Sequence, residues 1–506
     1  MKIFKTPDER ALCEAIGRIN YTNPFAPERL TLEKTILQHN YEESGDVWNL
    51  HSTLHAAKSR RNIGHLNTIA TQKILELQQR IATAKTGIDE AELLIFENSS
   101  IYYMFEKYRE RQLEELLNGV KSTVYPEFEA EFNHLNLSRT HRYQAPHTFA
   151  VFAQITRAFN HIFDFIIGST PAAGKLRADI WQSIFSYDIY RYNRVLYKCM
   201  QNITTLITGE SGSGKELVAQ AIANARYIPF NAAVRSFAKD YRSCFHPIHL
   251  AAMPGTLIES ELFGHRKGAF TGALDNRIGH FEQCQSCDSV FLDEIGEIGE
   301  DIQVKLLRIL QSRKFRRIGE SESRDFQGKV IAATNRDLPQ AIADGKFRND
   351  LYYRLCADQI ITPPLRQLLN GSPVELTNFV RVLACRLLDN EEAEIFTPQA
   401  VKWITANLTM QYPWPGNVRE LEQCVRNLLI RGHYSPCMLS GHATTANELA
   451  GQIRRGELNA NSLLQAYTRQ IFQQCGSYTA TAERLKLDRR TVKRYLDNSA
   501  DINGTN

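Results

Sequence analysis

The sequence predicts a multidomain protein with a mostly helical N-terminal region, a central α/β domain that has a parallel sheet and a helical lid, and a short helical domain at the end. Three observations predict this organisation. The chain has 506 residues, enough for about three domains of roughly 100–200 residues. Short β-branched segments alternate with amphipathic segments only in the middle of the chain. Near the end, basic residues gather on short helical patterns.

The composition is that of a soluble globular protein. Apolar residues make up 43% and charged residues 23% of the chain, and 60 basic against 56 acidic side chains give a net charge of +4. No segment has the ~18 consecutive apolar residues of a membrane span, and the N-terminus lacks the apolar stretch of a secretory signal. Ten scattered cysteines fit a reducing compartment better than a disulfide framework. We therefore expect a cytoplasmic protein without a membrane partner.

Residues 1–165 are expected to form a helical regulatory or sensor domain. Only four valines and five glycines occur there, whereas strands of a parallel sheet are rich in valine. Apolar residues recur instead at helical spacing: Ile74, Leu77 and Ile81; Ile101, Phe105 and Tyr108; Phe152, Ile155, Phe159 and Ile162. No strand ending in an acidic pair indicates phosphorylation by a sensor kinase, so small-molecule and partner-protein signals stay equally open.

Residues 166–436 are expected to form the α/β domain, with its core at 166–364 and the helical lid at 365–436. β-branched segments at 203–208, 289–294 and 329–334 predict buried strands. Residues 437–458 are polar and rich in small side chains, which is typical of a linker. Residues 459–506 then predict a compact helix-turn-helix.

A glycine-rich loop follows the first predicted strand and precedes a predicted helix. It consists of Gly209, Glu210, Ser211, Gly212, Ser213, Gly214, Lys215 and Glu216. Glycines let backbone N–H groups surround a phosphate, and the helix N-terminus adds positive potential. Lys215 supplies a charge to the β- and γ-phosphates. The loop therefore predicts a nucleotide site, although Glu216 stands where Ser or Thr usually binds Mg²⁺.

Two further strand ends complete this site. Asp293 and Glu294 end the second strand, so that one carboxylate can hold Mg²⁺ and the other can polarise a water. Asn335 ends the third strand, where its amide can sense a γ-phosphate. Arg348 and Arg354 lie six residues apart and could form a solvated basic face or reach a neighbouring subunit's nucleotide.

The segment Gly268, Ala269, Phe270, Thr271, Gly272 and Ala273 lies inside ESELFGHRKGAFTGA. Glycines at both ends suit an extended loop, and an exposed Phe at its tip suits a protein contact. GAFTGA is the signature loop of bacterial enhancer-binding proteins of the NtrC class, and residues 166 to about 431 resemble the central domain of that family motif for motif. Members are AAA+ ATPases that activate sigma-54 RNA polymerase.

The resemblance implies a role for each matching residue. Lys215 matches the phosphate-loop lysine, Asp293 the magnesium carboxylate, Glu294 the catalytic glutamate, Asn335 the first sensor, Arg348 and Arg354 the arginines that act in trans, and Arg419 the second sensor. It also implies ATP and Mg²⁺ as cofactors, a homo-hexameric ring, and a loop at 268–273 that contacts the sigma factor when ATP is bound. The family's loop characteristically reads GESGTGKE, so Glu216 fits it.

Three features depart from the family or stand outside it. His249 replaces an Asn that normally restrains the catalytic glutamate, which predicts a retained but retuned ATPase. The stretch between Lys215 and His249 is long and predicts an insertion beside the nucleotide. Cys284 and Cys287 form a lone C-x-x-C pair, which is weak evidence for metal or redox chemistry unless the fold adds Cys244, His246, His249 or His280.

The C-terminal segment predicts three helices, the first marked by Leu464, Tyr467 and Ile471, the second at 479–485, and the third at 489–496 after Asp488. The third would present its DNA-contacting side chains in a major groove: Arg489, Arg490, Thr491, Lys493 and Arg494. The segment resembles the DNA-binding tail of the same family, except that Lys486 stands where Gly often makes the turn.

The sequence therefore predicts a sigma-54-dependent activator that binds upstream DNA and uses ATP hydrolysis to remodel the sigma-54 RNA polymerase holoenzyme. Two alternatives stay open: an AAA+ remodeller of another protein, and a DNA-binding repressor with a vestigial ATPase. The charge agrees with a DNA-binding tail, because residues 451–506 have nine basic and five acidic side chains and the rest of the chain is balanced.

Overall fold

The computed structural model describes residues 2–42, 61–83, 87–119, 121–139, 142–436 and 459–497. The expected linker at 437–458 lies outside the described residues. The chain divides into two units, Met1–Gly432 and His433–Asn506, which are treated separately below. No helix in the described ranges is both long and apolar enough to cross a membrane.

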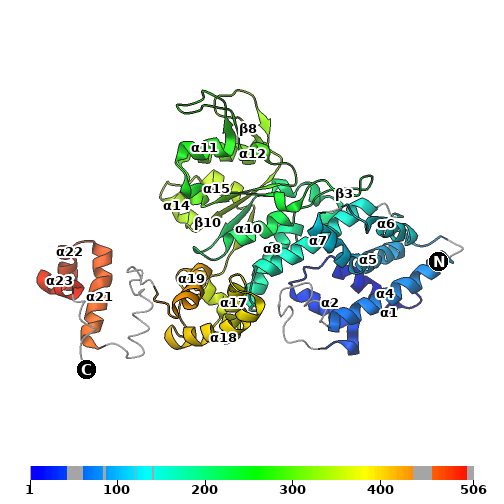
Figure 1. Ribbon diagram of the computed structural model, residues 1–506, viewed down its shortest axis with the longest axis horizontal. Helices are drawn as coiled ribbons and strands as arrows, with labels where there is room; N and C mark the ends of the chain where they lie inside the picture. The colour runs from blue at the N-terminus through cyan, green and yellow to red at the C-terminus, as the bar shows by residue number, and fades with distance from the viewer. Residues whose placement is uncertain are drawn as a thin grey trace. The chain divides into compact units, whose positions relative to one another are not determined.

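The N-terminal region is helical, as expected (Figure 1). Its helices are α1 (Pro7–Ile19), α2 (Pro27–Leu37), α4 (Arg61–Ala82), α5 (Glu90–Asn118), α6 (Tyr125–His134) and α7 (Ala145–Phe165). Thr6 caps α1 by accepting a hydrogen bond from the Glu9 backbone N–H at 3.1 Å. The expected apolar stripes form the core, since Ile74, Leu77, Phe105 and Tyr108 are all buried.

A five-stranded parallel sheet forms the centre of the α/β core. Its order is β11-β1-β10-β7-β4, and its strands are β1 (Thr205–Thr208), β4 (Phe245–His249), β7 (Ser289–Asp293), β10 (Lys329–Thr334) and β11 (Asp358–Ile361). Side chains alternate across a strand. Leu206, Val290, Leu292, Val330 and Ala332 enter one core, and Ile207, Phe291, Ile331 and Ala333 enter the other.

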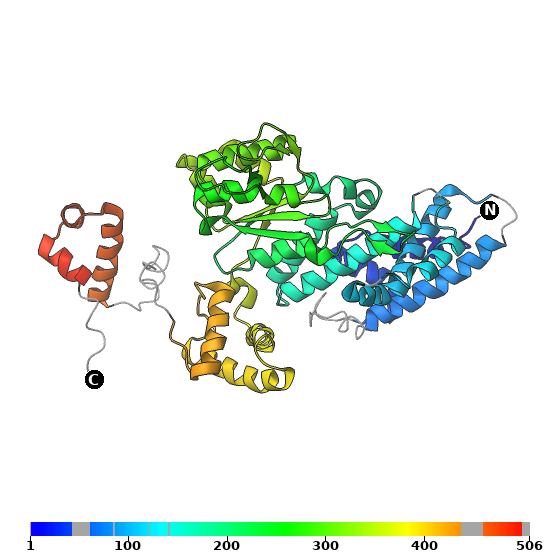
Figure 2. The ribbon, with the colours of Figure 1, turned by 45° about the horizontal axis from the view of Figure 1, so that its top comes forward.

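Helices cover both faces of this sheet (Figure 2). One core includes residues of α11 (Gly255–Phe263), α13 (Glu300–Ser312) and α15 (Asn349–Leu355). The other includes residues of α7, α8 (Pro171–Phe185) and α10 (Lys215–Asn224). The lid consists of α16 (Leu365–Leu369), α17 (Pro373–Cys385), α18 (Asn390–Asn407) and α19 (Asn417–Arg431).

Short elements connect these layers. The short helices are α9 (Ile189–Arg194), α12 (His280–Gln283) and α14 (Leu338–Ala343). The 3₁₀ turns are η1 (Gln38–Asn40), η2 (Leu196–Lys198), η3 (Met200–Asn202), η4 (Tyr241–Ser243), η5 (Leu250–Ala252) and η6 (Ile295–Glu297). Three two-stranded pairs are β2–β3 (Phe230–Asn231, Ser236–Phe237), β5–β6 (Gly264–His265, Arg277–Ile278) and β8–β9 (Lys314–Phe315, Arg324–Asp325).

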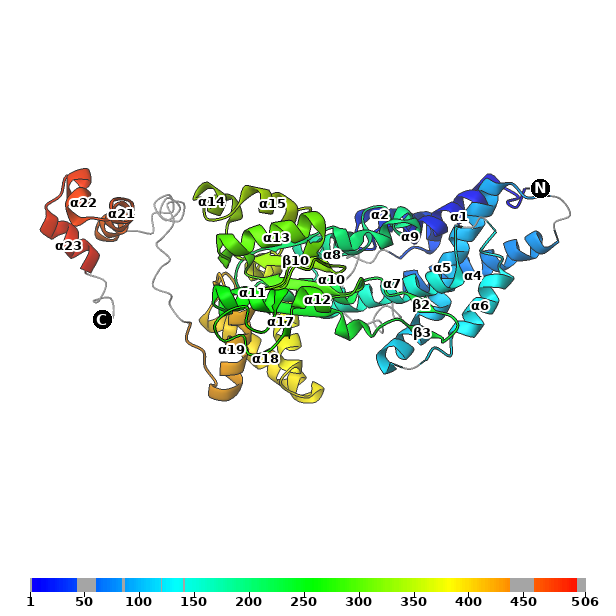
Figure 3. The same ribbon diagram turned by 90° about the horizontal axis from the view of Figure 1, so that it is seen from above.

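The expected insertion does not lie beside the nucleotide loop. Residues 229–243 form the β2–β3 hairpin, which packs on the N-terminal helices (Figure 3). The Phe230 ring lies 4.7 Å from that of Tyr125 and 4.8 Å from that of Phe149, between ring centroids. The Ser122 backbone N–H donates to the Arg235 carbonyl at 2.8 Å. The hairpin therefore joins the α/β core to the helical region.

Helix α7 also belongs to both parts. Its buried Arg157 donates from Nη1 to the Asn224 carbonyl at 3.2 Å and from Nη2 to the Arg226 carbonyl at 2.9 Å. Gln154 donates to the Ala225 carbonyl at 2.9 Å. These carbonyls end helix α10, so side chains of α7 satisfy its unpaired C-terminal groups.

Strand β10 begins with a buried lysine. Lys329 is only 2% exposed, and its Nζ donates to the Ile203 carbonyl at 2.6 Å. Burial lowers its pKa to about 7, although the negative charge of Asp358 opposes this shift.

The second unit contains α21 (Ala460–Cys475), α22 (Tyr478–Leu485) and α23 (Arg489–Asp497). These helices match the three that the sequence predicts. Ile471, Ala482 and Val492 are buried, one from each helix. Lys486 has φ of 54°, so it adopts the left-handed conformation that a Gly would accept more readily.

Candidate nucleotide site

The predicted nucleotide residues meet at one edge of the sheet because their strands are parallel neighbours. β1 pairs with β10, β10 with β7, and β7 with β4. Their carboxyl ends therefore place Gly209, Asn335, Asp293 and His249 along a single edge. Ligands of open α/β sheets bind at this edge.

The phosphate loop depends on glycine at two positions. Gly212 has φ of 74°, and a Cβ there would lie 2.4 Å from the Gly416 carbonyl oxygen. At Gly209 a Cβ would lie 2.0 Å from Thr362 Oγ1. The loop therefore packs closely on the strand β11 side and on the lid, and only glycine fits.

Lys215 is a buried cation at the start of α10. It is 7% exposed, and its Nζ donates to the carbonyls of Gly209 at 3.1 Å and Glu210 at 3.3 Å. Burial lowers its pKa, while the charges of Glu294 and Asp293 oppose the shift. A polyphosphate would supply the anion that this site favours, so the residues present fit ATP.

The two carboxylates have different surroundings. The Glu294 backbone lies in the left-handed region, with φ of 56°, and its Oε2 accepts from the Asn335 backbone N–H at 3.2 Å. Asp293 Oδ1 accepts from the Glu294 N–H at 3.1 Å, and Oδ2 lies 3.0 Å from His249 Nδ1. Non-glycine residues with left-handed backbone are concentrated at functional sites, where the strained backbone fixes the direction of the side chain.

His249 therefore pairs with Asp293. In the family that the chain resembles, the Asn at this position restrains the residue that matches Glu294. The register decides this, because His249 lies directly opposite Asp293 in the β4–β7 pair. The backbone of Asn335 holds Glu294 instead.

The lid docks on the phosphate loop through α16 and α19. Arg419 Nη1 lies 3.4 Å from Ser211 Oγ, so this lid cation reaches the phosphate loop. Asn417 does more than the sequence indicates: its Nδ2 donates to Glu210 Oε2 at 3.1 Å and to the Ser211 carbonyl at 3.0 Å. Arg366 also pairs with Glu210, at 2.6 Å. The sequence signal that could have indicated Asn417 is the Pro-Gly-Asn turn at the start of α19.

Two predicted loop residues point elsewhere. Ser213 is buried, and its Oγ donates to the Glu210 carbonyl at 2.7 Å and lies 2.7 Å from Thr362 Oγ1. Its hydroxyl therefore shapes the loop. Glu216 is exposed in the first turn of α10, where its charge favours the helix N-terminus.

Arg348 and Arg354 lie on the outside of the core. Arg348 pairs with Asp350 at 2.8 Å and is 38% exposed, and Arg354 is exposed on α15. In the described parts of this chain, no hydrogen bond or ion pair joins either arginine to the phosphate loop. Arg348 also lies 3.6 Å from Glu300.

The loop at 268–273 projects from the β5–β6 pair. Gly268 donates to the Ala273 carbonyl at 2.9 Å, and Ala273 donates to the Phe270 carbonyl at 3.0 Å. Phe270 is 41% exposed and Leu274 is 77% exposed. Positive φ angles at Gly268 and Gly272 turn the chain. Two large apolar side chains, Phe270 in the loop and Leu274 just after it, are therefore exposed to solvent.

The basic residues of α23 face outward in the second unit. Arg489, Arg490, Lys493 and Arg494 are exposed, whereas Thr491 is half-buried. Val492 is fully buried. The helix therefore has one apolar face against its neighbours and one basic face.

The C-x-x-C pair gains partners from β4. The ligand atoms of Cys244, Cys287 and Asp288 lie within 4.8 Å of one another, and so do those of His246, Cys284 and Asp288. Lys239 already neutralises Asp288, at 2.7 Å from Oδ1. In the described residues, neither of these groups includes His249 or His280.

Comparison with known proteins identifies the central region. Residues 189–361 match the sigma-54 interaction domain family. The DNA-binding transcriptional regulator NtrC of Rhizobium meliloti (strain 1021) is 38% identical over 308 residues, which cover 59% of this chain and 58% of that protein. A Nif-specific regulatory protein of Herbaspirillum seropedicae is 45% identical over 223 residues, 44% of this chain and 37% of that protein.

NtrX from Brucella abortus, solved in complex with ADP, is 22% identical, with coverage of 70% of this chain and 76% of its own and a TM-score of 0.39. The chain spans less than two thirds of the length of the two regulators above. The family match and the two regulators confirm the resemblance to sigma-54-dependent AAA+ activators for the central part of the chain.

Proposed function

We propose that the protein is a sigma-54-dependent transcription activator. It hydrolyses ATP in an oligomeric ring, remodels the sigma-54 RNA polymerase holoenzyme, and binds upstream DNA through its C-terminal helices. The observation that supports this most directly is the exposed Phe270 loop on the same domain as the nucleotide edge of the sheet.

The nucleotide edge supports hydrolysis. Lys215 and the loop N–H groups would bind the phosphates of ATP, and Asp293 would hold Mg²⁺. Glu294, held by the Asn335 backbone, would orient the attacking water, and the Asn335 side chain would sense the γ-phosphate. Arg419 on the lid would stabilise negative charge. His249, whose Nδ1 contacts Asp293, would then lie beside the Mg²⁺.

The exposed arginines support a ring. Among the described residues, no hydrogen bond or ion pair joins Arg348 or Arg354 to the phosphate loop, and arginines that act in trans raise phosphoryl-transfer rates by about 10³–10⁵. A neighbouring subunit, in a homo-hexamer by family resemblance, would bring its nucleotide to α15.

The basic face of α23 supports a DNA contact. Three short helices whose third is exposed and basic suit a helix-turn-helix, in which Arg489, Arg490, Lys493 and Arg494 contact bases or phosphates and Thr491 supports the helix.

Open-complex formation by sigma-54 holoenzyme tests the proposal, on a promoter joined to a DNA fragment selected by the protein. Wild type plus ATP should form open complexes. Glu294→Gln should bind ATP but neither hydrolyse it nor form open complexes, and Phe270→Ala should hydrolyse ATP without forming them. The control Tyr187→Ala, which removes another exposed aromatic side chain, should behave as wild type.

The same assay separates the alternatives. Wild-type ATP hydrolysis without open complexes would indicate a remodeller of another protein. DNA binding without any hydrolysis would indicate a repressor with a vestigial ATPase.

A further inference from the structure

A cluster of cysteine and histidine side chains lies at the sheet edge opposite the nucleotide site. Cys244 directly precedes strand β4 and His246 lies in it, whereas Cys284 and Cys287 lie in the turn between α12 and β7. Strands β4 and β7 are parallel neighbours. The amino ends of the two strands therefore bring a Cys-x-His pair and a Cys-x-x-Cys pair together.

The ligand atoms of these side chains surround the carboxylate of Asp288. The sulfur atoms of Cys244 and Cys287 lie within 4.8 Å of each other and of that carboxylate, and the ligand atoms of Cys284 and His246 do the same. Asp288 and all three cysteines are buried. Two thiolates bound to tetrahedral Zn²⁺ lie about 3.8 Å apart, because each Zn–S bond is about 2.3 Å long. The Cys244–Cys287 pair is thus within about 1 Å of the spacing that zinc requires.

His246 contributes a ring nitrogen that makes no hydrogen bond among the described residues. This atom, Nε2, is buried and lies 3.5 Å from Asp288 Oδ2. The side chain as a whole is 20% exposed, so an ion from solution can reach the cluster on this side. A buried imidazole nitrogen without a hydrogen bond, placed among thiols, is suited to bind a metal ion.

Two cations border the cluster, and they differ in how their charges are balanced. Lys239 Nζ lies 2.7 Å from Asp288 Oδ1, so these two charges neutralise each other. Arg226 is only 8% exposed, and its Nη2 donates to the Ser286 carbonyl, inside the Cys-x-x-Cys turn, at 2.6 Å. In the parts of the chain that the structure describes, no ion pair joins Arg226 to a carboxylate. A buried charge without a counter-charge is costly, and three thiolates around one Zn²⁺ would supply the negative charge that offsets Arg226.

We propose that this cluster binds one structural Zn²⁺ through three thiolates and one imidazole: Cys244, Cys284, Cys287 and His246. Such a set completes the tetrahedral coordination of a structural zinc, and thiolates select zinc over the harder divalent cations. The three thiols release their protons to solvent when the ion binds. Asp288, held by Lys239, stays outside the coordination sphere and orients the His246 ring.

The ion would fasten the insertion hairpin to the α/β core. The segment 229–243 ends directly before Cys244, and its hairpin packs on the N-terminal helices. Zinc would join the base of this segment to the turn before β7. Because the cluster lies at the amino ends of the strands, the ion stabilises the fold and takes no part in hydrolysis, so the site is independent of the proposed function.

Metal analysis of the full-length protein, purified without chelators and without a histidine tag, tests the site. We expect one zinc ion per chain. After a chelator has removed the zinc, Co²⁺ should bind with the visible absorption of a tetrahedral site and a near-ultraviolet band from thiolate-to-cobalt charge transfer. Added Zn²⁺ should abolish both absorptions. Absence of zinc together with no saturable Co²⁺ binding would overturn the proposal, and so would a Cys244–Cys287 disulfide in place of the metal.

Matched cysteine substitutions locate the site. Cys287→Ser removes one ligand and should weaken zinc binding at least about tenfold. Cys424→Ser removes another buried cysteine, from α19 of the lid, and should leave one zinc ion per chain. Equal zinc affinities of these two variants would refute the assignment.

Substitutions of the histidine keep the test decisive if Cys287→Ser fails to fold. His246→Cys preserves four ligands and should bind Co²⁺ with a stronger charge-transfer band, because it adds a thiolate. His246→Ala should bind Co²⁺ at least about tenfold more weakly than wild type. Identical cobalt affinities and spectra of wild type and His246→Ala would show that the imidazole is not a ligand and would refute the proposed set.

Discussion

Lys329 should make the stability of the α/β core depend on pH above neutrality. Burial lowers its pKa from the ordinary 10.5 to about 7. Between these values the unfolded chain binds a proton that the folded chain lacks, so the free energy of unfolding rises with pH. The full slope is about 1.4 kcal/mol per pH unit. From pH 7.5 to 9.5 this side chain should therefore add about 2 kcal/mol of stability.

The comparison with Lys329→Met isolates this effect, because Met fills a similar volume and does not titrate. Urea unfolding followed by tryptophan fluorescence at pH 7.5, 8.5 and 9.5 gives the free energy of unfolding of both proteins. The wild-type value minus the variant value should rise by about 2 kcal/mol over this range. Below pH 7, where both states hold the proton, it should level off.

A control substitution removes an exposed lysine. Lys346 is 69% exposed, and Lys346→Met should leave the pH dependence as it is in wild type. If the difference between wild type and Lys329→Met stays constant from pH 7.5 to 9.5, Lys329 is not a buried cation with a lowered pKa and the reasoning fails.

Two further predictions concern the loop and helix α7. Gly212→Ala should weaken ATP binding roughly tenfold, because a left-handed Ala costs about 1–2 kcal/mol and its Cβ meets the lid; fluorescent-nucleotide titration measures this. Gly174→Ala is its control, since a Cβ there has no atom within 4 Å, and equal affinities in the two variants would contradict the packing argument. Arg157→Met should lower the free energy of unfolding by about 2–4 kcal/mol, because two buried carbonyls lose their donors. Arg366→Met breaks an exposed ion pair and should cost less than about 1 kcal/mol; urea unfolding compares the two, and similar losses would show that Arg157 is not a structural cation.

Much of the nucleotide site could be predicted because a local sequence pattern marks the end of each strand. A buried β-branched segment that ends in polar residues places those residues at the sheet edge, whatever the rest of the chain does. Asp293, Glu294 and Asn335 follow this rule, and Lys215 follows from the glycine-rich loop between a strand and a helix. The three C-terminal helices could also be predicted from local sequence, since capping residues and apolar spacing define each of them.

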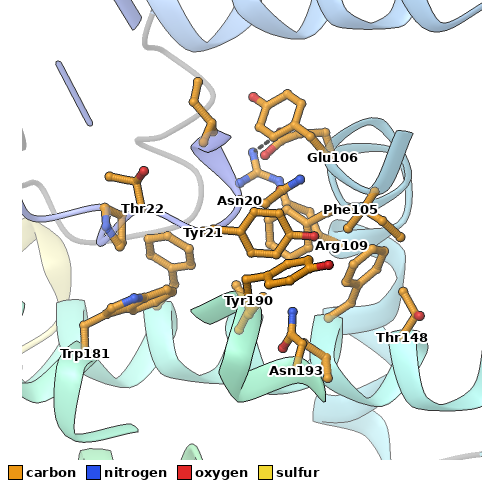
Figure 4. Close-up of a pocket in the computed structure, with 18 of the residues that line it drawn as sticks. Asn20, Tyr21, Thr22, Phe105, Glu106, Arg109, Thr148, Trp181, Tyr190 and Asn193 are labelled. Carbon is orange, nitrogen blue, oxygen red and sulfur yellow. Dashed lines mark ion pairs between the residues drawn. The ribbon is translucent and has the colours of Figure 1, made fainter. Parts of the chain in front are cut away.

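What could not be predicted depends on contacts between distant segments. The partner of His249 follows from the register of β4 against β7, which no local pattern encodes. Asn417 reaches the phosphate loop only because the lid folds back on it. A cavity among the N-terminal helices is lined by residues from several separate elements, so its aromatic wall forms no sequence motif (Figure 4).

Helix α7 contributes buried side chains to two hydrophobic cores, which limits where a different N-terminal region could be joined to this chain. Phe149 and Phe152 belong to the N-terminal core, and Ala158 and Ile162 to the core beneath the sheet. A chimaera that joins a foreign domain at residue 166 would remove the buried side chains of α7 from the α/β core and leave carbonyls at the end of α10 without their donors. The helical region and the α/β core are thus consecutive in sequence but share one set of buried contacts, so exchange of the helical region requires a junction N-terminal to residue 145.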